Sequence, residues 1–220
     1  MRIKRNLFIK NKQTIEFENT MSTLNYILKK FKIDLTAGSP VALSISREIE
    51  FPDLLKEMGM KKGVELGVFA GEYSEILMKR IPGLDLTGID AWKIYKEYKD
   101  YKRNESMINA YNQAKQRSEK TGFKIMQDWS TEAVKQFADE SLDFIYIDCN
   151  HDFAHVVEDL NVWSPKVKKG GIISGHDFFE SKDARYGVFY AVPAWCAYNQ
   201  VPMLFVMKND TVPSWFYVKP

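Results

Sequence analysis

The segment Gly63–Trp92 constrains the fold of this chain more than any other. It contains a short apolar run, a glycine-containing turn, an amphipathic stretch and a second apolar run that ends in Asp90. This order predicts a strand, a turn, a helix and a second strand. Glycine adopts turn conformations that other residues avoid and lets the backbone approach a ligand closely. A carboxylate at the tip of the second strand can accept hydrogen bonds from both hydroxyls of a ribose. The segment therefore predicts an α/β unit that binds a nucleoside.

The spacing of the turn glycines separates two kinds of cofactor. A dinucleotide-binding turn reads G-x-G-x-x-G. Here Gly67 is followed by Val68 and Phe69, so the second glycine is missing and a bulky ring would crowd a pyrophosphate. The turn instead reads E-x-G-x-x-x-G, from Glu65 to Gly71. A carboxylate favours a cation, and S-adenosylmethionine (SAM) carries an ammonium and a sulfonium but no phosphate. The turn favours SAM over a dinucleotide; a glycine turn with no cofactor is the alternative.

From Phe51 onward, strand-like and helix-like stretches alternate. The predicted strands span residues 64–68, 86–89, 123–126, 142–147, 172–174, 203–207 and 214–218. The predicted helices span residues 52–58, 72–80, 105–120, 131–137, 153–163 and 188–198. This alternation predicts a parallel sheet with helices on both faces. The last two strands are joined by a short loop, so one of them must be antiparallel.

Residues 1–50 lack this rhythm and are predicted to form an N-terminal cap or extension on a domain that spans residues 51–220. An apolar stripe of Leu24, Ile27, Leu28 and Phe31 predicts a helix there, with Ser22 as its cap. Such an extension covers a substrate, contacts a second subunit or simply packs on the domain.

The composition bounds the class of protein. The 220 residues are 45% hydrophobic, which suits one domain with a full core plus an extension. The net charge of +2 neither demands nor excludes a nucleic-acid partner. Cys149 and Cys196 form no metal or redox motif, no signal-peptide pattern follows Met1, and no apolar run approaches membrane-spanning length. We therefore expect a cytoplasmic protein without a membrane partner, and a homo-oligomer is compatible with the sequence.

Polar residues with catalytic chemistry gather where the predicted strands end. In an open α/β sheet, ligands bind at these carboxyl ends. The ends carry Gly67, Asp90, Asp128-Trp129-Ser130, Asp148-Cys149-Asn150-His151 and Ser174-Gly175-His176-Asp177. Asp148 and Asp177 end strands predicted to be neighbours, about 5 Å apart at the backbone, so both carboxylates can reach one ion. Magnesium prefers such oxygen ligands.

These motifs resemble those of a known family. The E-x-G-x-x-x-G turn followed by Asp90 resembles the first two motifs of class I SAM-dependent methyltransferases. The segment I-D-C-N-H-D-F-A-H, followed by G-G-I-I-S-G-H-D, resembles a family that includes metal-dependent macrolide-sugar O-methyltransferases and, more distantly, catechol O-methyltransferases. The resemblance covers about residues 60–180. It implies a Rossmann-like, seven-stranded sheet, mostly parallel with one antiparallel strand.

The resemblance also implies roles for individual residues. The implied SAM-binding residues are Glu65, Gly67, Phe69, Gly71, Asp90, Trp92, Asp128, Trp129, Ser130 and Asp148, with Trp92 stacking on the adenine. The implied ligands of a divalent cation, magnesium or manganese, are Asp148, His176 and Asp177. His176 departs from the family, which has a carboxylate or amide there. His151 corresponds to the general base, acting beside Asp148; the alternative is a structural histidine that caps the next helix. Asp159, on that helix, is expected to pair with a loop.

We therefore predict a SAM-dependent O-methyltransferase that modifies a hydroxyl of a sugar or other small polyol. Basic stretches near the N-terminus and in Lys93–Lys120 leave an RNA or protein methyltransferase as one alternative. A D-P-P-Y motif, typical of base-amine methylation, is absent, so a nucleic-acid partner is not expected. A SAM-binding subunit without catalysis is the other alternative.

Overall fold

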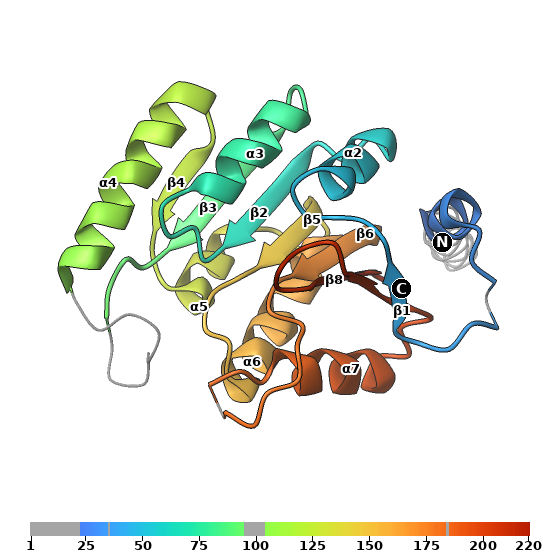
Figure 1. The fold of residues 1–220 in the computed structure, drawn as a ribbon. Helices are drawn as coiled ribbons and strands as arrows, with labels where there is room; N and C mark the ends of the chain where they lie inside the picture. Colours follow the sequence, from blue (N-terminus) through green and yellow to red (C-terminus); the bar gives the residue numbers. More distant parts are fainter. Residues whose placement is uncertain (1–22, 35, 95–103, 184) are drawn as a thin grey trace, which may run out of the picture.

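A computed structural model describes residues 23–34, 36–94, 104–183 and 185–220. Its strands are β1 (Val41–Leu43), β2 (Lys62–Leu66), β3 (Asp85–Asp90), β4 (Lys124–Gln127), β5 (Leu142–Ile147), β6 (Val167–Gly175), β7 (Leu204–Met207) and β8 (Ser214–Val218). They form one eight-stranded sheet in the order β1-β7-β8-β6-β5-β2-β3-β4 (Figure 1). Only β8 runs antiparallel to its neighbours, β6 and β7. The predicted mostly parallel sheet with one antiparallel strand is therefore confirmed.

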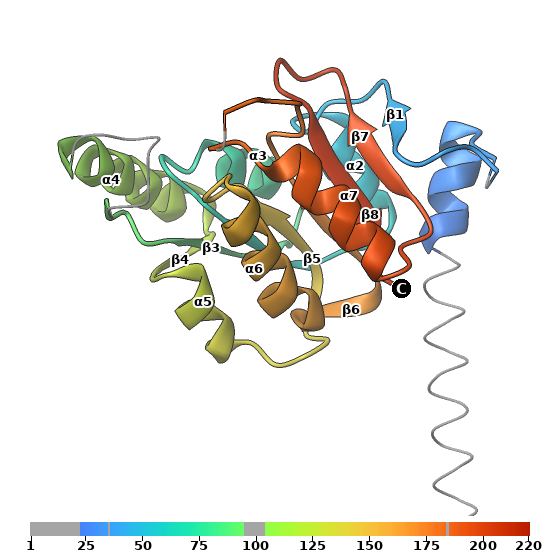
Figure 2. The ribbon, with the colours of Figure 1, turned by 90° about the horizontal axis from the view of Figure 1, so that it is seen from below.

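Helices cover both faces of the sheet. They are α2 (Glu50–Glu57), α3 (Glu72–Arg80), α4 (Asn104–Thr121), α5 (Ser130–Ala133), α6 (Phe153–Trp163) and α7 (Val188–Tyr198). Two 3₁₀ turns, Val134–Gln136 and Ser164–Lys166, follow α5 and α6. The helices α2, α3 and α4 lie on one face, and α5, α6 and α7 lie on the other (Figures 1 and 2). The predicted helix over residues 131–137 is thus a short α-helix that tightens into a 3₁₀ turn.

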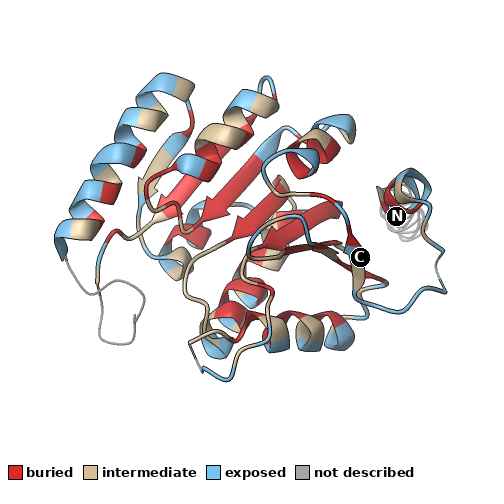
Figure 3. Cartoon of the chain, in the orientation of Figure 1, coloured by how far each residue is buried: buried red, intermediate tan, exposed pale blue. Residues whose placement is uncertain are grey.

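The sheet supplies a hydrophobic core on each face, because successive side chains of a strand point to opposite sides. In β5, Phe144 and Tyr146 pack in the cluster under α2 and α3, while Ile145 and Ile147 pack in the cluster under α6 and α7. The central strands are buried and the outer side of α4 is exposed (Figure 3). No helix in the described residues is long and apolar enough to span a bilayer.

The described part of the N-terminal region is joined to the sheet. Residues 23–31 are helical, and Leu24, Ile27 and Leu28 are buried in the core cluster under α2 and α3. The predicted cap residue Ser22 lies outside the described residues. Farther along, β1 pairs in parallel with β7 and adds an eighth strand at the edge. The sequence did not reveal this strand, because three residues are too few to show a period of two.

The order of the strands determines where a ligand-binding crevice forms. The chain runs outward from β2 through β3 to β4 in one direction, and from β5 through β6 in the other. The carboxyl ends of β2 and β5 therefore lie side by side where the strand order reverses. Such a switch point leaves a crevice above the sheet, where ligands of open α/β folds bind.

Candidate active site

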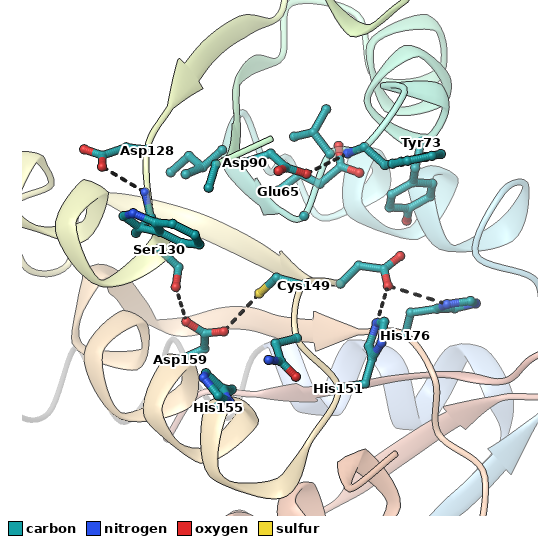
Figure 4. Close-up of a pocket in the computed structure, with 18 of the residues that line it drawn as sticks. Glu65, Tyr73, Asp90, Asp128, Ser130, Cys149, His151, His155, Asp159 and His176 are labelled. Atoms are coloured by element: carbon teal, nitrogen blue, oxygen red, sulfur yellow. Dashed lines mark hydrogen bonds and ion pairs between the residues drawn. The ribbon is translucent and has the colours of Figure 1, made fainter. Parts of the chain in front are cut away.

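A cavity of about 600 Å³ lies at the carboxyl ends of β2 to β6. Its walls include most of the residues predicted from the sequence (Figure 4). These are Glu65, Gly67, Phe69, Asp90, Asp128, Trp129, Ser130, Asp148, His151, His176 and Asp177. Two predicted residues, Gly71 and Trp92, do not line the cavity.

The glycine turn after β2 fits its site only because it lacks side chains. Gly67 has φ +85°, and a Cβ there would lie 2.0 Å from the carbonyl oxygen of Asp148. Any other residue would collide with the end of β5, so Gly67 is required for β2 and β5 to approach closely. Gly71 has φ +83° and forms the N-cap of α3. It lies against Ala114 of α4 and shapes the turn from behind.

Asp90 holds the turn in place with both of its carboxylate oxygens. Oδ2 accepts a hydrogen bond from the backbone N–H of Phe69 at 2.9 Å, and Oδ1 accepts one from that of Trp92 at 2.7 Å. Burial raises the pKa of Asp90, and these backbone donors oppose the rise. Each oxygen keeps a further lone pair, so the carboxylate can still accept bonds from a ribose.

Trp92 supports this turn instead of lining the cavity. Its side chain is buried, its indole N–H donates to the carbonyl oxygen of Phe69 at 2.7 Å, and its ring meets Tyr111 edge-on. The expectation that Trp92 stacks on an adenine is therefore wrong, because the ring is already packed away from the cavity. Trp129 does line the cavity and is 38% exposed, so it is the indole open to a ligand.

Glu65 is a buried acid in the cavity wall. It is 2% exposed and accepts a hydrogen bond from the Ser74 hydroxyl. Burial, together with the charges of Asp148 and Asp90, raises the pKa of Glu65 to about 8. Such a carboxyl group is ready to ionise beside a cationic ligand.

On the α6 side, Asp159 joins the first residue of α5 to the loop after β5. It is buried and accepts hydrogen bonds from Ser130 Oγ at 2.6 Å and from Cys149 Sγ at 3.0 Å. The expected pairing of Asp159 with a loop is confirmed. This arrangement fixes the chain after β4 and β5, so that Asp128 and Trp129 form one end of the cavity wall.

Two acids and a histidine, Asp148, Asp177 and His151, converge at the other end of the cavity, where Figure 4 labels His151 and His176. His151 Nε2 lies 2.9 Å from Asp177 Oδ2 and 3.3 Å from Asp148 Oδ1. One ligand atom from each of the three lies within 4.8 Å of the others. His176 Nδ1 is 3.7 Å from Asp148 Oδ1 and 3.6 Å from Asp177 Oδ1. The neighbouring histidines hold the pKa of Asp177 well below its usual range.

The cap of α6 is Asp152, whose carboxylate accepts from the backbone N–H of His155 at 3.0 Å. The alternative that His151 serves as the cap is therefore wrong. His151 lies one residue before the cap, and its backbone carbonyl accepts from the N–H of Gly187. Its ring is left to face the two aspartates.

Sequence reasoning missed Arg47 and Tyr73, which both line the cavity. Arg47, just before α2, donates from Nη1 to Asp148 Oδ2 and to the hydroxyl of Tyr146, each at 3.3 Å. Its guanidinium lies 5.1 Å from the centre of the Tyr73 ring. No local pattern marks Arg47, because it follows no predicted strand end and reaches the cavity only through the tertiary fold.

Comparison with known proteins identifies the family. The sequence model of the methyltransferase-domain family matches residues 64–178, just over half of the chain. The chain belongs to this family. The matched region begins in β2 and ends just after Asp177. It therefore contains the glycine turn and the acid–histidine cluster. The class I methyltransferase family and fold predicted from the sequence are confirmed.

The chain is also similar to the uncharacterized protein R132 of Acanthamoeba polyphaga mimivirus. The two are 25% identical over 115 residues, which are 52% of this chain and 50% of that protein. The chain thus matches about half the length of this curated relative.

Solved structures share the fold at low sequence identity. An O-methyltransferase from Bacillus cereus in complex with S-adenosylhomocysteine (SAH) superposes with a TM-score of 0.59 at 16% identity, covering 90% of this chain and 91% of that one. The O-methyltransferase TomG from Streptomyces achromogenes, in complex with SAM and involved in tomaymycin synthesis, gives 0.58 at 13% identity, covering 93% and 89%. At these identities the likeness establishes the fold alone.

Proposed function

We propose that this protein is a SAM-dependent O-methyltransferase that transfers a methyl group to a hydroxyl of a sugar or other small polyol. One observation carries the proposal. A single cavity has Asp90 and the buried Glu65 along one wall and the Asp148–His151–Asp177 cluster at another. The first wall suits the ribose and ammonium of SAM, and the second suits activation of a hydroxyl. Holding both reactants in one cavity supplies much of the rate by positioning.

The cluster has the donors that a divalent cation needs. His176 Nδ1 lies 3.7 Å from Asp148 Oδ1 and 3.6 Å from Asp177 Oδ1, and one atom each of Asp148, His151 and Asp177 lies within 4.8 Å of the others. Ligands that share one ion at bond lengths of roughly 2.1 Å lie roughly 3 Å from one another, so the residues fit an ion. Asp148, Asp177 and His176 would hold it, and a nitrogen ligand admits manganese as well as magnesium. A bound ion would lower the pKa of an acceptor hydroxyl.

His151 is our candidate for the base. A histidine oriented by a carboxylate is held in one tautomer, and its neutral ring can accept a proton from a nearby hydroxyl. The contact between His151 and Asp177 supplies this orientation. Asp148 Oδ1 contacts the same nitrogen, Nε2, at 3.3 Å.

We further propose that the enzyme is cytoplasmic and acts on a small molecule. Both cysteines are free, in keeping with a reducing compartment. No described feature favours an RNA or protein acceptor over a small one. A SAM-binding subunit without activity would have no need for an acid and a base held together in one cavity.

Loss of the Asp90 carboxylate should weaken binding of the cofactor product. In isothermal titration calorimetry, we expect wild type to bind SAH and Asp90→Ala to bind it more weakly by about 1.5–3 kcal/mol. The exposed Asp85, at the other end of β3, is the matched control, and Asp85→Ala should bind SAH like wild type. Failure of wild type to bind SAH, or binding of NADH instead, would contradict the assignment of the cofactor.

Binding should also release a proton. In the free protein the pKa of Glu65 is raised to about 8, so at neutral pH the carboxyl group is mostly protonated. The ammonium of SAH favours the ionised form, so binding lowers this pKa and expels the proton. Affinity should therefore rise with pH up to about 8, and calorimetry in buffers of different ionisation enthalpy should detect the proton. In Glu65→Gln both effects should vanish; a pH-independent affinity in wild type would contradict the argument.

A further inference from the structure

Arg47 lines the cavity, and one edge of its guanidinium makes no hydrogen bond within the described part of the chain. Both of its side-chain hydrogen bonds leave from Nη1, and none leaves from Nε or Nη2 to any residue that the structure describes. The Nε–Nη2 edge is one of the planar forks with which arginine binds a carboxylate through two parallel bonds. The side chain is 22% exposed, so it is partly desolvated but still reachable.

The position of Arg47 is fixed before any ligand arrives. Its backbone N–H donates to both carboxylate oxygens of Asp210, in the loop between β7 and β8, at 3.1 and 2.9 Å. Its guanidinium is held over the Tyr73 ring and against the Tyr146 hydroxyl. The free edge is thus preorganised, which lowers the entropic cost of binding.

A second donor beside Arg47 has no partner. The Tyr73 hydroxyl is buried and makes no hydrogen bond, although Tyr73 lines the cavity. Figure 4 shows this hydroxyl pointing from α3 toward the strand ends that carry the acid–histidine cluster. A buried hydroxyl left without a partner costs free energy, which a ligand oxygen would recover. Arg47 and Tyr73 together therefore offer three donors to one anionic group.

The neighbours of this pair indicate which anion it binds. Glu65 accepts from Ser74, the residue after Tyr73, and lies opposite Tyr146 in the β2–β5 register. Tyr146 in turn bonds Arg47. An acid for an ammonium and an arginine for a carboxylate therefore lie beside each other. This is the arrangement of charges that the α-amino-acid end of SAM requires.

We propose that Arg47 and Tyr73 bind the α-carboxylate of the cofactor, so that the segment before α2 is part of the cofactor site. This inference rests on the proposed function. It gives the N-terminal region a role in binding in addition to its packing on the sheet. A carboxylate on the acceptor is the other source of the same chemistry, and the experiment below separates the two.

The test compares SAH with its decarboxylated analogue, 5′-S-(3-aminopropyl)-5′-thioadenosine, by calorimetry. Arg47→Gln should weaken SAH binding by about 10–100-fold and leave the affinity for the analogue unchanged. Wild type should bind the analogue more weakly than SAH by a similar factor. Arg80→Gln, which removes a half-buried arginine of α3 paired with Asp53, is the matched control and should bind both ligands like wild type.

A second variant separates binding from folding. Tyr73→Phe keeps the ring beneath Arg47 and removes only the unpartnered hydroxyl, so the melting temperature of the free protein should not fall. Its affinity for SAH should drop by about 10-fold, as expected for a lost bond to a charged group. If both variants bind SAH like wild type, or if Arg47→Gln weakens SAH and the analogue equally, the inference is wrong. A wild-type protein that does not bind SAH would instead overturn the proposed function.

Discussion

Removal of divalent ions with EDTA is expected to abolish methyl transfer and to leave SAH binding largely intact. The proposed ion serves the acceptor hydroxyl, whereas the ribose and amino-acid contacts of the cofactor come from Asp90, Glu65 and their neighbours. Methyl transfer would be followed as SAH release over a panel of sugars and polyols, and SAH binding by calorimetry on the same EDTA-treated protein. Added manganese or magnesium should restore turnover.

Direct binding of the ion provides a measurement that does not depend on the acceptor. Wild type should bind one Mn²⁺ per chain by electron paramagnetic resonance, and Asp177→Asn should lose at least about 10-fold in affinity. This substitution is conservative, because Asp177 has φ 58° and asparagine tolerates that conformation. The matched control is Asp139→Asn, which changes an exposed acid paired with Lys166. Full activity in excess EDTA, with Mn²⁺ binding equally to both variants, would remove the ion from the proposal.

The sequence predicted those parts of the fold that local patterns determine. The bounds of β5, α6, α7 and β8 agree with the prediction, because each element is a continuous apolar or amphipathic run between residues that break it. Gly67 was singled out from spacing alone, and the structure supplies the reason: a Cβ there would collide with Asp148. The strand ends brought together the predicted acids and histidines, since the ends of parallel strands share one edge of the sheet.

What the sequence did not predict depends on contacts between distant residues. The strand β1 exists because β7, more than 160 residues later, gives it a partner. Arg47 belongs to the cavity because Asp210 and Tyr146 fix it there. Trp92 has an aromatic ring that could stack on a base, but its indole N–H donates to the carbonyl oxygen of Phe69. No spacing rule predicts this hydrogen bond. In each of these cases, the position in the tertiary structure decided the outcome, and the residue type did not.

Replacement of His151 is expected to have the largest effect on turnover of any single substitution considered. If the ring takes the acceptor's proton, His151→Ala should lower the rate by about 10²–10⁴ while SAH affinity changes little. His151→Asn is the sharper variant, because it keeps a polar side chain of similar reach but cannot act as a base. The contact of its backbone carbonyl with Gly187 is preserved in both variants.

The position of His151 between two carboxylates means that turnover alone cannot assign its role. Nε2 lies 2.9 Å from Asp177 and 3.3 Å from Asp148, so the same nitrogen could bind an ion held by the two acids. The affinity of His151→Asn for Mn²⁺ separates the two functions. A base leaves that affinity unchanged while the rate falls, whereas a ligand loses affinity and rate together. Near-normal turnover would end both assignments and leave His176, 3.7 Å from Asp148, as the remaining histidine of the cluster able to accept the proton.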